Sequence, residues 1–165
     1  MIELSFFSET NEKEWNDAVK KLDGNYFFTH EYLQYYKYLK IDNLINKSFI
    51  LKEKNKILSI TPLLIFKNGL IKEASFAGNP LLFSLIAKVQ NNQRYNQILN
   101  KIYEKKTELS KKYDVKKILV RLPYISNNDN YVFSKEIINK FNLTIIKSSD
   151  FFSLRSTAEL ILNLE

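Results

Sequence analysis

The stretch ILSITPLLIFKNGLIKEASF, residues 57–76, decides the fold because it predicts two neighbouring antiparallel strands. Apolar and β-branched residues run from Ile57 to Phe66 and again from Leu70 to Phe76, a composition typical of strands. Asn68-Gly69 between the two runs is a hairpin signal, because both residues accept positive φ. Pro62 cannot donate to a strand ladder, so it predicts a bulge or an edge position within the first run.

Two further strands are predicted before this hairpin. Ser48 to Leu51 is a short apolar run, and Lys54-Asn55 separates it from Ile57 as a second hairpin signal. Ile2 to Phe7 is suited to a first strand. The N-terminal half therefore predicts one strand, an interval, and then a three-stranded antiparallel meander.

Two amphipathic helices are predicted in that interval. Thr10 or Asn11 is placed to cap the first helix, and Gly24 is suited to the left-handed turn that stops it. Thr29 is the expected N-cap of the second helix, with Glu31 favourably placed in its first turn. The apolar faces are Trp15, Ala18, Val19 and Leu22 in the first helix, and Tyr32, Tyr35, Tyr36 and Leu39 in the second.

The C-terminal half alternates between helix and strand. A long amphipathic helix is expected from Asn92 to Tyr113, followed by a buried strand from Val115 to Leu122. A shorter helix from Ser134 to Phe141 and strands from Leu143 to Lys147 and Ala158 to Leu164 complete the order. This order predicts an α/β (α+β) fold over residues 1–165, with a mixed, mostly antiparallel sheet flanked by helices.

The composition excludes several kinds of chemistry. The chain of 165 residues has no cysteine, so it has no disulfide, thiolate metal site or cysteine nucleophile, and its one histidine is His30. We therefore expect no metal centre. The N-terminus lacks the pattern of a secretory signal, and no apolar run is long enough to span a bilayer, so we expect a cytoplasmic protein without a membrane span.

The net charge of +7 is weaker evidence of a partner than it first suggests. Of the 25 basic residues, 22 are Lys, and together with 18 Asn and 18 Ile they form the composition that AT-rich codons produce. Nucleic-acid surfaces usually cluster their basic residues and use Arg for bidentate contacts, whereas these lysines are spread along the chain. A non-enzymatic module that binds RNA or a protein through a Lys-rich surface stays open as the alternative function.

The order of elements resembles that of the GNAT-like acyl-CoA N-acyltransferase fold. Local patterns resemble one branch of it, the Fem-type (peptidoglycan aminoacyltransferase-like, or FemAB-like) acyltransferases, and in particular their N-terminal domain. These patterns cover nearly the whole chain as short segments: Trp15, Tyr26–Leu33, Ile57–Leu63, Phe76–Leu82, Lys117–Arg121 and Thr157–Leu164.

The resemblance implies an acyl or aminoacyl transferase acting on an amine of a cell-envelope or polysaccharide precursor. Fem-type proteins typically join two GNAT-like domains, so residues 1–165 resemble the first half and are not expected to be catalytic alone. The implied partners are a second GNAT-like domain, in the same or a neighbouring chain, and an aminoacyl-tRNA or another acyl donor. A fragment, a split protein and a one-domain relative with a non-standard CoA loop all stay open, as does a homo-oligomer.

The sequence also argues against binding of acyl-CoA by this domain. GNAT acetyltransferases hold the CoA pyrophosphate on backbone N–H groups of a glycine-rich loop at a helix N-terminus. Between Phe76 and Asn92 the chain has one glycine, Gly78, followed by bulky residues, and the R/Q-x-x-G-x-G/A pattern is absent. No cofactor is therefore expected from the sequence.

Four residues are candidates for substrate binding, and no catalytic residue is identified. Arg121 interrupts a buried strand at its carboxyl end, near Tyr124, where open α/β sheets often bind ligands; a structural ion pair is the alternative. Asn79 lies in a loop that could border the same end of the sheet. His30, near a helix N-terminus, is suited to a neutral base, or is simply a hydrogen-bonded helix-start residue.

Overall fold

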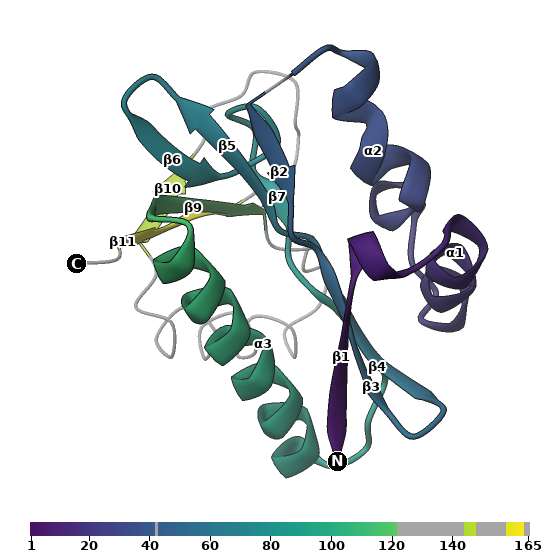
Figure 1. The fold of residues 1–165 in the computed structure, drawn as a ribbon. Helices are drawn as coiled ribbons and strands as arrows, with labels where there is room; N and C mark the ends of the chain where they lie inside the picture. Colours follow the sequence, from purple (N-terminus) through teal and green to yellow (C-terminus); the bar gives the residue numbers. More distant parts are fainter. Residues whose placement is uncertain (42, 122–143, 148–157, 164–165) are drawn as a thin grey trace.

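Two β-sheets form the centre of the molecule (Figure 1). The computed structural model describes residues 1–41, 43–121, 144–147 and 158–163. The first sheet is antiparallel, with the order β1 (Ile2–Phe6), β3 (Phe49–Glu53), β4 (Lys56–Thr61) and β8 (Leu85–Ile86). The second has the order β10 (Thr144–Lys147), β11 (Ala158–Asn163), β9 (Val115–Arg121), β6 (Ile71–Ala74), β5 (Leu64–Asn68) and β2 (Leu44–Asn46).

The second sheet is mixed. β6 pairs in parallel with β9, and the short strand β7 (Leu81–Leu82) also pairs in parallel with β9. The other pairings of this sheet are antiparallel. The predicted mixed, mostly antiparallel sheet is thus confirmed, and both parallel pairings join strands that are separated by α3, which serves as the crossover connection that parallel strands need.

The chain passes from one sheet to the other at Pro62. The predicted single strand from Ile57 to Phe66 is in fact two strands, β4 in the first sheet and β5 in the second. Pro62 has no backbone N–H, so it interrupts the strand pairing where the chain bends between them. The prediction of a bulge or an edge at Pro62 therefore becomes a switch between sheets.

Helices cover both faces of the first sheet (Figure 1). The long helix α3 (Asn92–Lys112) lies on one side, whereas α1 (Glu12–Lys21) and α2 (His30–Tyr38) lie on the other. Two 3₁₀ turns, η1 (Phe7–Glu9) and η2 (Tyr26–Phe28), lead into α1 and α2. In the described part of the chain, no helix is long and apolar enough to cross a membrane.

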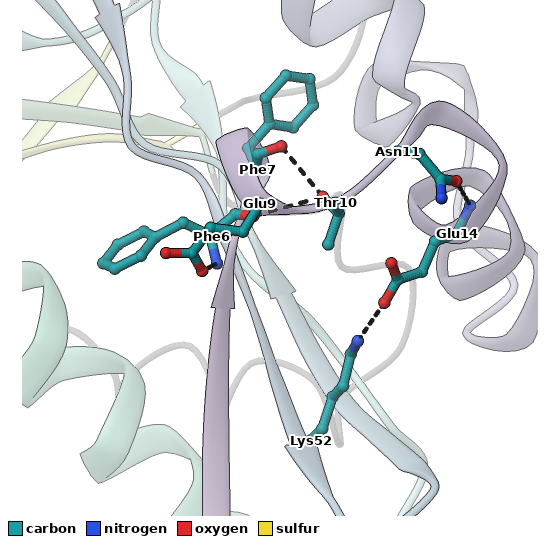
Figure 2. Close-up of polar contacts among 7 residues, drawn as sticks. All are labelled: Phe6, Phe7, Glu9, Thr10, Asn11, Glu14 and Lys52. Atoms are coloured by element: carbon teal, nitrogen blue, oxygen red, sulfur yellow. Dashed lines mark hydrogen bonds and ion pairs between the residues drawn. The ribbon is translucent and has the colours of Figure 1, made fainter.

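The start of α1 is fixed by its cap and by one ion pair (Figure 2). The Asn11 side chain accepts a hydrogen bond of 2.8 Å from the backbone N–H of Glu14, as the sequence predicts for one of its two candidate caps. The Glu14 carboxylate in turn pairs with Lys52 of β3 at 2.5 Å. These contacts fix the helix against the sheet.

Trp15 anchors α1 in the core. It is fully buried, and its indole N–H donates to the carbonyl of Phe28 at 2.8 Å, which satisfies the polar atom of a buried ring. The helix ends at Lys21, and Asp23, just beyond its C-cap, adopts the positive φ of 54° that was expected of Gly24. Gly24 is needed for a different reason: a Cβ there would lie 2.6 Å from Leu85 and 2.7 Å from Val19.

The apolar face of α2 differs from the prediction. Leu33 is the buried residue of this helix, whereas Tyr35 and Leu39 are 45% and 48% exposed. Thr29 caps the helix as expected, accepting a hydrogen bond from the N–H of Tyr32. The predicted helix from Ser134 to Phe141 lies outside the described residues.

Candidate functional site

A small apolar pocket lies between α2, the bend at Pro62 and β7. Its volume is about 80 Å³. No side chain in its lining carries a formal charge at neutral pH. The lining consists of Phe27, Tyr32, Leu33, Pro62, Phe76, Pro80, Leu81 and Leu82.

One wall of this pocket is a cluster of aromatic rings around Tyr32. The Tyr32 ring stacks on Phe76 with a centroid distance of 5.4 Å, and it meets the edges of Phe27 at 5.1 Å and Tyr26 at 5.7 Å. Tyr26 and Phe27 are 61% and 48% exposed. The aromatic wall is therefore open to solvent on one side, where a flat ligand can reach it.

A tight turn forms the rim of the pocket beside Phe76. Phe76 and Asn79 exchange backbone hydrogen bonds of 2.8 and 3.0 Å across Ala77 and Gly78. Both central residues have positive φ, 50° at Ala77 and 89° at Gly78, as a two-residue turn of this hand requires. Glycine supplies this conformation without strain, which explains its place in the sequence.

A buried carboxylate lies beneath this turn. Glu73 of β6 is 2% exposed, and it is the one buried carboxylate among the side chains that the structure describes. The Ser75 hydroxyl donates to Glu73 Oε1 at 2.6 Å, and the N–H of Gly78 donates to Ser75 Oγ at 2.9 Å. Two short hydrogen bonds thus connect the turn to the acid, which helps to offset the cost of burying it.

The two sheets diverge directly after β7. Leu81 and Leu82 pair with Val120 and Arg121 of β9, whereas Leu85 and Ile86 already pair with β4 of the other sheet. The intervening residues Phe83 and Ser84 make the crossing, and Ser84 Oγ accepts a buried hydrogen bond of 2.9 Å from Thr61. This divergence lies next to the pocket, because Leu81 and Leu82 line it.

The four predicted substrate-binding residues fall in different surroundings. Asn79 lies in the turn beside the pocket, and its exposed amide donates to the carbonyl of Phe76 at 3.3 Å. The backbone of Arg121 pairs with Leu82 of the pocket wall. His30 instead lies between the helices, stacked on Phe7 at 4.7 Å and hydrogen-bonded to Gln34 at 2.9 Å. Tyr124 lies outside the described residues.

The sequence does not single out Glu73 as a base: it offers four loop aspartates, Asp42, Asp114, Asp129 and Asp150, with nothing to distinguish them. Of these, Asp114 is exposed, and its hydrogen bond with Lys116 lowers its pKa; the others lie outside the described residues. The signal for Glu73 was a charge within a predicted strand, alternating with the apolar residues Ala74 and Phe76.

Comparison with known proteins identifies the fold but not a sequence relative. No protein-family model matches the chain, and no curated protein matches it in sequence. Solved structures do match. An acetyltransferase of the GNAT family from Staphylococcus aureus has a TM-score of 0.59 and 12% identity, and the match covers 100% of both chains. An N-acetyltransferase of Campylobacter jejuni has a TM-score of 0.54 and 16% identity over 99% of both chains.

A third match corrects the expectation about acyl-CoA. An acetyltransferase of Bacillus subtilis, solved in complex with CoA, has a TM-score of 0.52 and 13% identity over 100% of both chains. CoA binding is thus found on this fold, and the prediction that this domain does not bind acyl-CoA is wrong. The missing glycines do not exclude such binding, because backbone N–H groups bind phosphate and residues 87–91 before α3 contain no proline.

The neighbours support the GNAT-like part of the resemblance, while the Fem-type branch stays a prediction. They are acetyltransferases, so they do not favour a non-enzymatic binding module. Their coverage, the mixed sheet and the flanking helices lead to one conclusion about architecture. The chain has the GNAT acetyltransferase fold.

Proposed function

We propose that this chain transfers an acetyl group from acetyl-CoA to an amine held at the aromatic pocket. The observation that supports this most is the place of Glu73: a buried carboxylate, linked through Ser75 to the turn that rims the pocket. The proposal also draws on the fold, which acetyltransferases share.

The reaction needs a group that takes a proton. The lone pair of the acceptor amine attacks the thioester carbonyl, so that a C–N bond forms, the C–S bond breaks and the nitrogen loses a proton. The Glu73 carboxylate, directly or through the Ser75 hydroxyl, is the proton acceptor that we assign. A positioned general base typically contributes 10²–10⁴-fold to a rate.

The turn before α3 is suited to the phosphates of the donor. Asn91 caps the helix by accepting from the N–H of Gln93 at 2.7 Å, and the partial positive charge of a helix N-terminus favours an anion. Lys88 and Arg94 flank this turn, where Lys88 pairs with Asp23 at 3.3 Å and Arg94 with Glu53 of β3 at 2.5 Å. The donor would therefore meet cations on both sides of the turn.

For the acceptor we propose an amine of a cell-envelope or polysaccharide precursor. The half-exposed ring of Phe27 in the pocket lining offers an apolar surface, against which the apolar face of a sugar ring can pack. The uncharged lining does not favour an acceptor that brings several charges into the pocket. A second GNAT-like domain, as in Fem-type proteins, is compatible with this proposal.

The test is acetyl transfer with a panel of amines. Acetyl-CoA is mixed with glucosamine, a lysine-containing peptide or spermidine, and the release of free CoA and the acetylated product are both measured. We expect the amino sugar to be the best acceptor. Glu73→Gln should abolish most of the transfer, whereas the matched variant Glu104→Gln, on the exposed side of α3, should not. Absence of both transfer and CoA binding would overturn the proposal.

A further inference from the structure

Lys106 of α3 is a second buried ionisable group, besides Glu73. The helix α3 covers the face of the first sheet that is opposite to α1 and α2 (Figure 1). Lys106 is 8% exposed and belongs to the buried side of the helix. It lies between Ile102 and Leu109 in the sequence, both of which are buried in the core. Among the side chains that the structure describes, it is the one buried cation.

The described residues around Lys106 provide no counterion for its ammonium group. Its neighbours on α3 do form ion pairs: Lys101 with Glu104 at 2.7 Å and Lys105 with Glu108 at 2.6 Å. Within the described residues Lys106 has no such carboxylate, and its Nζ lies over the Phe83 ring, 5.5 Å from the centroid. One turn further along α3, the buried hydroxyl of Ser110 also has no hydrogen-bond partner in the described part of the chain.

This environment favours the uncharged amine. Burial lowers the pKa of Lys106 to about 8, from a usual value near 10.5. At pH 7 about a tenth of the amine is therefore the free base, the nucleophilic form of a lysine, against far less than one per cent for a lysine with the usual pKa. The π-face of Phe83 partly stabilises the charged ammonium form of Lys106. An aromatic ring is not a counterion, however, and it does not neutralise the charge.

The position of Lys106 connects it with the donor. Phe83 lies in the crossing between β7 and β8, where the two sheets diverge beside the pocket. The helix that carries Lys106 begins at the turn to which we assign the donor phosphates. Fourteen residues of helix, on the order of 21 Å, separate Asn92 from Lys106.

We propose that Lys106 is an acylation site, whose amine accepts an acyl group from an acyl-CoA thioester bound by this same chain. The identity of the donor rests on the proposed function. The neutral Nζ attacks the thioester carbonyl; a C–N bond forms, the C–S bond breaks, and CoA leaves as a thiolate that takes up the proton lost by the nitrogen. The products are Nε-acyl-Lys106 and CoA. The modification removes the one buried cation of the described core, a charge that no carboxylate of the described residues pairs.

The test is self-acylation of the full chain without any acceptor amine. The protein is incubated with acetyl-CoA between about pH 6.5 and pH 10, and acetylation of each lysine is followed by peptide mapping in a mass spectrometer. We expect Lys106 to react first, with a rate that rises roughly 25-fold from pH 6.5 to 8.5 and then levels. Lys105, paired and more exposed, is the control; its slower reaction should keep rising to pH 10.

Two variants and a second reagent keep the outcome decisive. Lys106→Met should lose the early acetylation, and Lys105→Met should retain it. Reaction of Lys106 with p-nitrophenyl acetate but not with acetyl-CoA would overturn the proposal, because the amine would be reactive without access to the donor. If transfer to an external amine proceeds while Lys106 stays unmodified, the inference fails and the proposed function stands. If acetyl-CoA does not bind at all, the proposed function fails first.

Discussion

The two buried ionisable groups of the described core, Glu73 and Lys106, are treated in opposite ways. Glu73 receives a hydroxyl hydrogen bond of 2.6 Å, and that hydroxyl is itself held by the N–H of Gly78. Lys106 faces an aromatic ring and has the unpartnered hydroxyl of Ser110 one turn away. The first environment supports a charge, whereas the second makes the charge costly. We infer that hydrogen bonds compensate for the burial of Glu73, whereas no hydrogen bond or ion pair of the described residues does so for Lys106.

The largest expected difference between the two is in catalysis. Glu73→Gln keeps the shape and still accepts from Ser75, but it cannot take a proton, so kcat/KM for amine acetylation should fall by roughly 10²–10⁴-fold. Lys106→Met should change kcat/KM by less than about tenfold, because we place Lys106 outside the transfer to an external amine. Steady-state kinetics on both variants, with circular dichroism to verify folding, measures this. Equal losses would remove the distinction.

The next effect is on stability and has the opposite sign. Lys106→Met removes a buried cation that has no ion pair among the described residues, and it should raise the free energy of unfolding at neutral pH by roughly 3 kcal/mol, the size of a pKa lowered from 10.5 to about 8. The unfolded chain binds more protons between these values, so the wild type should gain stability as pH rises from about 8 to 10.5.

Urea denaturation at several pH values tests this. The stability of Lys106→Met should lack the rise seen in the wild type above pH 8. Lys105→Met is the control and should change stability by no more than about 1 kcal/mol, since it removes a partly exposed ion pair. A parallel rise in wild type and Lys106→Met would show that another group causes it.

The two hydroxyls sharpen the comparison on a smaller scale. Ser75→Ala leaves Glu73 without its donor and should cost about 1–3 kcal/mol in the free energy of unfolding. Ser110→Ala removes a buried polar atom that has no partner among the described residues, so it should be neutral or slightly stabilising. Chemical denaturation of the two single variants measures both. A larger loss from Ser110→Ala would mean that this hydroxyl does have a role.

The smallest expected effect is at the turn above Glu73. Gly78 has a φ of 89°, and a Cβ there would meet nothing closer than Glu73 Oε1 at 3.9 Å. Gly78→Ala should therefore cost only the backbone strain, about 1 kcal/mol. The thermal midpoint should fall by a few degrees. If the turn positions Glu73, kcat/KM should also fall, by more than the loss of stability alone would cause. An unchanged midpoint would show that the turn relaxes without cost.

Most of the architecture could be predicted because local signals determine it. The expected helix from Asn92 to Tyr113 and the strand from Val115 to Leu122 match α3 and β9 to within one residue at each end. The bend at Pro62 was anticipated only as an irregularity, since a sequence pattern does not say which strand will pair with which. The bend depends on these pairings, which place β4 between β3 and β8 of the first sheet and β5 between β6 and β2 of the second.

The site was harder to predict because burial, not residue type, gives it its chemistry. Lys106 follows Ile102 by four residues and precedes Leu109 by three, so its position in the expected amphipathic helix carried a signal, but lysine is usually exposed. Glu73 became a candidate base only once the structure showed that it is buried, hydrogen-bonded to Ser75 and covered by the turn at Gly78. Arg121 and Asn79, chosen for their place at the end of a strand and in a loop, do lie next to the pocket wall in backbone position.

The order of the strands along the chain also bears on how the protein folds during synthesis. The first sheet is complete once the ribosome has added Ile86, since β1, β3, β4 and β8 all precede that point. β6, in contrast, has its edge unpaired until α3 and then β9 have been translated. The nascent chain thus displays an open strand edge for some forty residues of elongation. Slow translation across α3 would prolong that exposure, and a chaperone that covers strand edges would act in this interval.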